Sequence, residues 1–267
     1  MAAGQGARAP GRPAQAASPA RAAAGGGPRP PATARPPLAV LLRVEPQNQF
    51  PQLPNGCEVT SLSMLLGAVG HPVSKMRLAR LMPVDPTPRR LGAGGQILAW
   101  GDPNVGFVGS VYVHADGFGM YHGPVVRLID RLLPGRGLDL TGRPFDSLLA
   151  RVAAGQPVEV WTTVPLSPDV PWVTWQSPEG PVHTTLEEHA VLLVGYTPSK
   201  VLIANPFNGE AAQSVPRARF IASWQVMGRQ AVTVAGARVP AQDRCVGRLS
   251  ACRLPPASGG QAGRRQA

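Results

Sequence analysis

Cys57 has the residue type and the position of a nucleophile. It follows Gly56 and begins the segment CEVTSLSMLLGAVG, whose apolar residues recur every three or four positions and predict a helix with one buried stripe. Unpaired N–H groups and the helix dipole at such an end favour a thiolate, the reactive form of cysteine. Because cysteine is also among the most commonly buried residues, its position alone fits a structural role as well.

Two further residues give Cys57 possible partners. His189 lies 132 residues downstream, and Asn205 lies another 16 residues on. This is the chain order of papain-type enzymes, in which cysteine, histidine and asparagine are distant in sequence and adjacent in the fold. A lone histidine on a strand is more often a core or edge residue, so the hypothesis requires that the three side chains meet.

A predicted β-hairpin would bring His189 and Asn205 together. Both lie in β-rich runs, HAVLLVGY and KVLIANP, which are joined by the turn TPS. If the turn is centred near Pro198, the numbers of cross-strand partners sum to about 396, and those of His189 and Asn205 sum to 394. Opposed residues have Cβ atoms roughly 5 Å apart, so the amide can reach the imidazole.

The remaining pattern predicts an α+β fold, with an N-terminal helical part packed on an antiparallel β-sheet. Asn55 is the expected cap of the helix at Cys57, and residues 84–122, rich in Gly and Pro, show no clear period. Other elements are expected as strands at 39–44, 157–164 and 230–234, and as helices at 75–82, 124–133, 145–154 and 216–226.

Composition sets the domain boundaries. Residues 1–37 contain 13 Ala, 8 Pro, 6 Gly and 5 Arg and have almost nothing to bury, which predicts a disordered tail. Residues 236–267 turn to Gly, Arg, Ala and Pro and predict a flexible basic tail. The tails carry 11 of the arginines and one aspartate, so they hold nearly all of the net charge of +11. The domain over 38–235 is almost neutral, which argues against a specific nucleic-acid surface.

No segment is apolar and long enough for a membrane span or a secretory signal, so we expect a soluble chain whose compartment the sequence leaves open. Three cysteines argue against a disulfide scaffold. Cys245 and Cys252 could pair or stay free, and they lack a second pair to complete a zinc site. We expect no metal and no organic cofactor, and the oligomeric state is open.

Five segments carry a family resemblance: QFPQLPNGCEVTSLSMLL, WGDPNVGFVG, GQPVEVWTTV, EEHAVLLVGY and VLIANPFNG. Together they resemble the papain-like cysteine peptidases of family C-39, in particular its stand-alone bacterial branch, over roughly residues 39–235. The resemblance implies Cys57 as nucleophile, His189 as general base and acid, and Asn205 as the residue that orients the imidazole. It also implies Gln49 as the oxyanion donor. The family usually has aspartate where Asn205 stands.

The choice of oxyanion donor has an alternative. Gln49 lies 8 residues before Cys57 and Gln52 lies 5 before it, and either carboxamide could reach the site. Gln49 is favoured because its separation matches the stand-alone branch better. A solvated loop amide is the alternative role for either residue.

Other candidates are weaker. His183, Glu187, Glu188 and His189 are close in sequence, but HTTLEEH matches no established metal-ligand spacing. Glu188 should point to the opposite face of the strand from His189 and should not orient it. Three tryptophans could line a peptide groove: Trp161, Trp172 and Trp175. For Trp161, packing in the core is at least as good an interpretation.

The sequence therefore predicts a thiol hydrolase that cleaves a peptide or related amide bond of a peptide or protein substrate. Two rival functions stay open. One is acyl transfer or amide cleavage by the same three residues, since one triad serves several acceptors. The other is a noncatalytic peptide-binding module that keeps the fold.

Overall fold

A computed structural model describes residues 37–247 of the protein. Within this range the main sheet has eight strands, all paired antiparallel. Six of them follow one another in the spatial order β12 (Glu210–Pro216), β11 (Lys200–Asn205), β10 (Glu188–Tyr196), β7 (Val158–Thr163), β13 (Ala231–Val234) and β6 (Gly137–Asp139). Strand β1 (Val40–Leu42) pairs with β10 on one edge and with β14 (Arg244–Val246) on the other.

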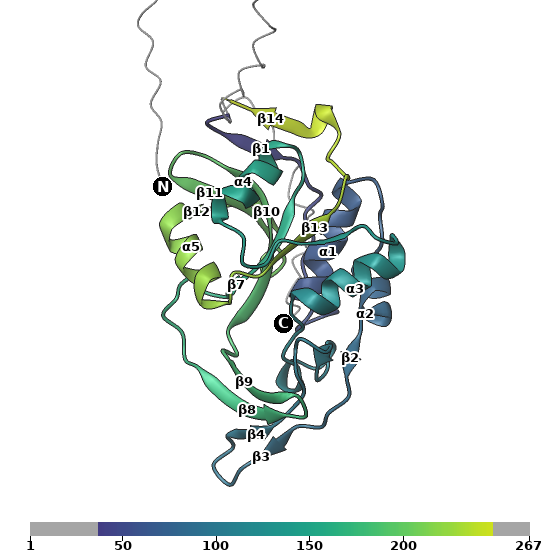
Figure 1. Ribbon diagram of the computed structural model, residues 1–267, viewed down its shortest axis with the longest axis vertical. Helices are drawn as coiled ribbons and strands as arrows, with labels where there is room; N and C mark the ends of the chain where they lie inside the picture. The colour runs from purple at the N-terminus through teal and green to yellow at the C-terminus, as the bar shows by residue number, and fades with distance from the viewer. Residues whose placement is uncertain (1–36, 248–267) are drawn as a thin grey trace, which may run out of the picture. The chain divides into compact units, whose positions relative to one another are not determined.

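Five α-helices accompany this sheet in the described part of the chain: α1 (Cys57–Ala68), α2 (Lys75–Leu81), α3 (His122–Leu132), α4 (Phe145–Ala153) and α5 (Arg217–Val226). Figure 1 shows α1, α2 and α3 on one side of the sheet and α5 on the other. Helix α1 packs across β10 and β7. This is the α+β arrangement that the sequence predicts, with early helices against an antiparallel sheet.

A smaller sheet lies at one end of the main sheet (Figure 1). Its strands are β3 (Arg90–Leu91), β4 (Ile97–Ala99), β8 (Val173–Ser177) and β9 (Gly180–Thr184). Nearby, β2 (Val84–Asp85) pairs in parallel with β5 (Phe107–Val108), and a short 3₁₀ helix spans His114–Asp116. Strands of two or three residues are too short to show a hydrophobic period, which explains why residues 84–122 gave none.

The predicted β10–β11 hairpin is present in the expected register. Leu192 pairs with Ala204 and Leu193 with Ile203, and each pair of numbers sums to 396. A bulge then shifts the register at Gly195. Because the bulge lies on the turn side of these pairs, it does not disturb the end of the hairpin that carries His189 and Asn205.

Asn55 is not the cap of α1, contrary to the sequence-based expectation. The N-cap residue is Gly56, and no side chain bonds the helix end. The Asn55 amide instead donates to the backbone carbonyls of Ser110 (2.8 Å) and Val113 (2.9 Å). These bonds tie a loop more than fifty residues away to the start of α1.

The folded part continues beyond residue 235, where composition had placed the start of the basic tail. Val239 is fully buried, and its N–H donates to Gly155 over 2.8 Å. Cys245 in β14 pairs with Leu41 of β1, whereas Cys252 lies outside the described residues. A count of Gly, Pro and Arg cannot detect these pairings, because β14 is only three residues long.

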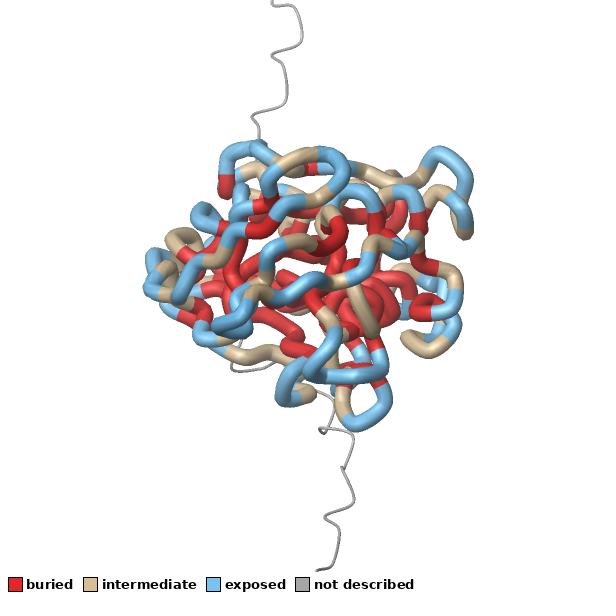
Figure 2. The backbone as a smooth tube through the Cα atoms, turned by 90° about the horizontal axis from the view of Figure 1, so that it is seen from below, coloured by how far each residue is buried: buried red, intermediate tan, exposed pale blue. Residues whose placement is uncertain are grey.

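Burial follows the layers. Figure 2 shows buried segments in the interior and exposed loops around them. Leu62, Leu65 and Leu66 of α1 are buried, as are all nine residues of β10. In the described residues, no helix has both the length and the apolar character needed to cross a membrane.

Candidate active site

Cys57 is the first residue of α1 and is buried, with 5% of its surface exposed. Its Sγ lies 3.4 Å from Oε2 of Glu58, to which the thiol donates. A backbone hydrogen bond from Ala190, the residue after His189, also reaches the sulfur. The Ser61 hydroxyl donates to the Ala190 carbonyl at 3.2 Å, so the start of α1 is fixed directly against β10.

His189 and Asn205 meet across the hairpin, as predicted. The imidazole Nε2 lies 2.8 Å from Asn205 Oδ1. Because an amide oxygen can only accept, Nε2 carries the proton and Nδ1 keeps the free lone pair. Asn205 is itself held by Nδ2 donating to Gln213 (2.6 Å) and by the Phe207 N–H donating to Oδ1 (3.0 Å).

The two candidate oxyanion donors point to different places. Gln49 is 3% exposed and lines the same cavity as Cys57 and His189. Its Nε2 donates one hydrogen to the Pro54 carbonyl at 2.7 Å, which leaves the second N–H available. The Gln52 carboxamide instead accepts from Lys75 at 3.0 Å on the exposed surface. Of the two glutamines, Gln49 is the one that lines the cavity of Cys57.

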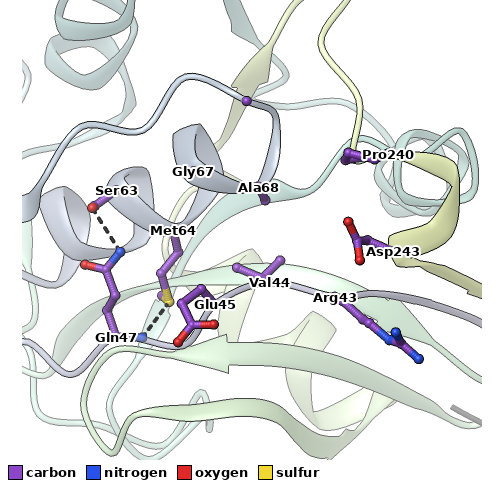
Figure 3. A pocket seen from close by; sticks show the side chains of 11 residues that line it. Arg43, Val44, Glu45, Gln47, Ser63, Met64, Gly67, Ala68, Pro240 and Asp243 are labelled. Atoms are coloured by element: carbon purple, nitrogen blue, oxygen red, sulfur yellow. Dashed lines mark hydrogen bonds between the residues drawn. The ribbon is translucent and has the colours of Figure 1, made fainter. Parts of the chain in front are cut away.

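The loop that carries Gln49 is fastened to α1. Gln47 Nε2 donates to the Ser63 hydroxyl at 3.0 Å, and its backbone N–H points to Met64 Sδ at 3.3 Å (Figure 3). These contacts lie at the edge of a separate cavity of about 500 Å³, whose charged lining residues are Arg43, Glu45 and Asp243. That cavity contains no residue of the Cys57 site.

The site opens into a cavity of about 250 Å³. Two partly exposed apolar residues stand at its rim, Leu186 (54% exposed) and Phe207 (44% exposed). Phe207 also packs edge-on against the His189 ring, with centroids 5.9 Å apart. Further lining residues, none of them singled out from the sequence, are Arg89, Ile97, Trp100, His114, Phe118 and Val164.

Burial governs the charge state of the pair. It raises the pKa of the Cys57 thiol well above its ordinary value, and the carboxylates of Glu58 and Glu188 raise it further. This direction is opposite to the one expected from the helix end, which should favour a thiolate, because burial and two nearby carboxylates favour the thiol. Burial also lowers the pKa of His189 to about 4, against the opposing effect of the Asn205 hydrogen bond. Both shifts favour the neutral forms, a thiol and an unprotonated imidazole.

Three buried glutamates interact with one another near the site: Glu58 of α1, Glu159 of β7 and Glu188 of β10. Burial raises the pKa of Glu58 to about 7, although the Met120 N–H donates to its Oε1 at 2.5 Å. Burial also raises the pKa of Glu159 and of Glu188, and Glu58 adds to both shifts. Among the described residues, no hydrogen-bond partner is found for either oxygen of Glu159 or of Glu188.

Glu159 should make the fold less stable as pH rises. Its pKa is higher in the folded state, so its contribution is fully present below the ordinary carboxyl pKa and is lost as pH rises through the folded value. The free energy of unfolding of wild type should fall by up to about 1.4 kcal/mol per pH unit for this group. In Glu159→Gln that fall should be smaller, as measured by urea unfolding between pH 5 and pH 9.

The exposed Glu179 supplies the control for this experiment. Glu179→Gln should leave the pH dependence of unfolding unchanged. Parallel pH profiles for wild type and Glu159→Gln would show that Glu159 ionises equally in the folded and unfolded chains.

The weaker sequence candidates have other surroundings. His183 bonds Thr174 (2.8 Å) and stacks on the partly exposed Trp172, so it belongs to the small sheet. Trp161 and Trp175 are buried. Glu188 does not orient His189, as expected, but it lies behind Cys57, and the sequence gave no sign of this. Ligand atoms of Cys57, Glu58 and Glu188 lie within 4.8 Å of one another.

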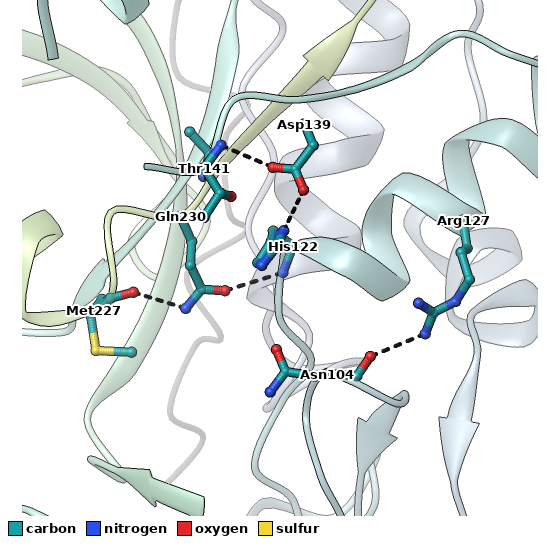
Figure 4. Close-up of polar contacts among 8 residues, drawn as sticks. Asn104, His122, Arg127, Asp139, Thr141, Met227 and Gln230 are labelled. Carbon is teal, nitrogen blue, oxygen red and sulfur yellow. Dashed lines mark hydrogen bonds and ion pairs between the residues drawn. The ribbon is translucent and has the colours of Figure 1, made fainter. Parts of the chain in front are cut away.

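A histidine–carboxylate pair outside the cavity holds secondary structure together. His122 Nδ1 lies 2.7 Å from Asp139 Oδ2, and the His122 N–H donates to Gln230 Oε1 at 3.2 Å (Figure 4). These bonds join the start of α3 to β6 and to the residue before β13. This pair belongs to the framework, since it is not among the residues that line the Cys57 cavity.

Comparison with known proteins gives three likenesses. The sequence profile described as "Peptidase_C39 like family" matches residues 41–232. The Bacillus subtilis (strain 168) protein YvpB, which is described as uncharacterized, is 35% identical over 198 residues, covering 74% of this chain and 75% of YvpB. A crystal structure from Bacillus anthracis, described provisionally as a C39-like peptidase, has 36% identity and a TM-score of 0.67 over 74% of this chain and 98% of that chain.

Proposed function

Because the chain belongs to the Peptidase_C39 like family, we propose that it is a cysteine peptidase that cleaves a peptide bond through Cys57, His189 and Asn205. The observation that carries the proposal is the 2.8 Å bond between His189 Nε2 and Asn205 Oδ1, beside a cavity that Cys57, His189 and Gln49 all line. The substrate class is a peptide or protein segment that enters this cavity.

The proton positions define the acylation step. The Cys57 thiol turns from Glu58 toward the imidazole, whose Nδ1 takes the thiol proton while Nε2–H stays on Asn205. The sulfur attacks the substrate carbonyl carbon, and the backbone N–H of Cys57 and Nε2 of Gln49 bind the oxyanion. Nδ1–H then protonates the leaving amine as the C–N bond breaks, which leaves a thioester.

Deacylation reverses the proton movement. Nδ1 takes a proton from water, the hydroxide attacks the thioester carbonyl, and the C–S bond breaks as the proton returns to sulfur. The acid product leaves, and the neutral thiol and imidazole are restored. His189 can begin each half-reaction at neutral pH because its pKa of about 4 keeps the ring unprotonated.

Covalent labelling tests this proposal directly. A peptide carrying a thiol-directed electrophile should modify Cys57, as mapped by mass spectrometry, and the Cys245→Ala chain should be labelled equally. A Cys57 that stays unmodified while the electrophile labels another residue of the chain would refute Cys57 as the nucleophile.

Gln49→Ala should lower kcat by about 100- to 1000-fold, the usual cost of removing one oxyanion donor. The measurement is steady-state hydrolysis of a fluorogenic peptide that the wild-type chain cleaves. Gln52→Ala is the matched control and should leave kcat unchanged, because its carboxamide bonds Lys75 outside the cavity. Equal losses in the two variants would count against the assignment of Gln49.

A further inference from the structure

We propose that Cys57, Glu58 and Glu188 together bind a divalent cation of the zinc class, with the cysteine sulfur and one oxygen of each carboxylate as ligands. The three ligand atoms lie within 4.8 Å of one another. Zinc binds sulfur at about 2.3 Å and carboxylate oxygen at about 2.1 Å, so a tetrahedral ion places S and O about 3.6 Å apart. The observed distance from Cys57 Sγ to Glu58 Oε2 is 3.4 Å.

Glu188 gives independent evidence for a ligand. Its side chain is 7% exposed, and neither carboxylate oxygen has a hydrogen-bond partner. Such a group is costly to bury unless something binds it. Gly119 leaves room for both carboxylates, because a Cβ there would lie 2.5 Å from Glu58 Oε1 and 2.9 Å from Glu188 Oε2.

Charge favours a cation at this position. Glu58, Glu159 and Glu188 are all buried, and the ion pairs of the described residues involve none of them. Cys57 and Glu188 line the cavity, so an ion can reach them from that side, and the cavity leaves a fourth coordination position for water. Binding releases the thiol proton, together with any proton held by the Glu58 and Glu188 carboxyl groups, to water as the bonds to the ion form.

The ion would hold the sulfur toward Glu58 and Glu188. A sulfur bound to the ion in that orientation cannot attack a substrate carbonyl, so zinc should inhibit the enzyme reversibly. This consequence for activity rests on the proposed function, whereas binding of the ion does not.

Cobalt titration tests the site without turnover. Adding Co²⁺ to the full chain at fixed pH should produce a thiolate-to-cobalt charge-transfer band that saturates at one ion per chain. Cys57→Ser should abolish the band, and Glu188→Gln should weaken binding at least about tenfold, the factor that 1.4 kcal/mol represents. Glu187→Gln, a change in the adjacent and less buried glutamate, is the matched control and should bind Co²⁺ as wild type does.

A band that survives in Cys57→Ser, or that is absent from wild type at millimolar Co²⁺, would overturn the cation site. Equal affinity in wild type and Glu188→Gln would do the same. If circular dichroism shows Glu188→Gln to be unfolded, Glu58→Gln takes its place with the same expectation. If the chain binds Co²⁺ here but cleaves no peptide when the ion is absent, the cation site is retained and the peptidase is refuted. If the metal-free chain cleaves peptides but gives no band with Co²⁺, the peptidase is retained and the cation site is refuted.

Discussion

Cys57→Ala is expected to lose peptide hydrolysis by roughly a millionfold, the scale seen when the nucleophile of a hydrolase triad is removed. The loss arises because no thioester can form, while the cavity and the His189–Asn205 bond remain. Turnover of a fluorogenic peptide that wild type cleaves measures the effect. Stability should change much less, because the substitution removes only a buried sulfur at the first turn of α1.

Two controls separate chemistry from folding in this variant. Urea unfolding should show that Cys57→Ala is folded under assay conditions. Cys245→Ala replaces a cysteine in β14, which does not line the active-site cavity, and should retain activity. Hydrolysis by Cys57→Ala at more than about a hundredth of the wild-type rate would refute covalent catalysis at this residue.

His189→Ala is expected to lower kcat by at least about 10⁴-fold, because no other group in the proposed mechanism accepts the thiol proton. Burial raises the pKa of Cys57, so the thiol is neutral at assay pH and depends on a base more than an exposed cysteine would. The same variant should therefore react more slowly with iodoacetamide at Cys57, as mapped by mass spectrometry.

His183→Ala is the matched control for His189. It removes a histidine from the small sheet, where the ring bonds Thr174 and stacks on Trp172. Its turnover and its alkylation at Cys57 should match wild type. If His183→Ala lost as much activity as His189→Ala, a nonspecific structural effect would explain both results.

The residues of the proposed triad could be predicted because each depends on a local pattern. The helix at Cys57 follows from the spacing of its apolar residues, and the meeting of His189 with Asn205 follows from the turn position and the two-residue period of paired strands. The resemblance to the C-39 peptidases is confirmed by the match over residues 41–232.

The electrostatics of the site could not be predicted in this way. Glu58 in the first turn of a helix suggests only a charge that complements the dipole. It also interacts with Glu159 and Glu188, which lie on two strands more than a hundred residues away. Burial of a carboxyl group is a property of the assembled core, so the raised pKa of the Cys57 thiol was not foreseen.

The small sheet escaped prediction for a related reason. Strand β4 pairs with β8 through Ala99 and Gln176, so the pairing depends on contacts across the chain and not on a repeated pattern within it. The same holds for Asn55, whose amide bonds a loop near Ser110 and not its own helix. These long-range contacts bring His114 and Phe118 to the cavity that Cys57 lines.

Strand β14 has a consequence for how the molecule behaves toward copies of itself. It covers the outer edge of β1, whose other edge joins β10. A chain shortened to end at residue 235 would leave the N–H and C=O groups of that edge open to an incoming strand. Such a chain would gain a template for intermolecular β-pairing and would be prone to aggregate, although Cys57, His189 and Asn205 would all be retained.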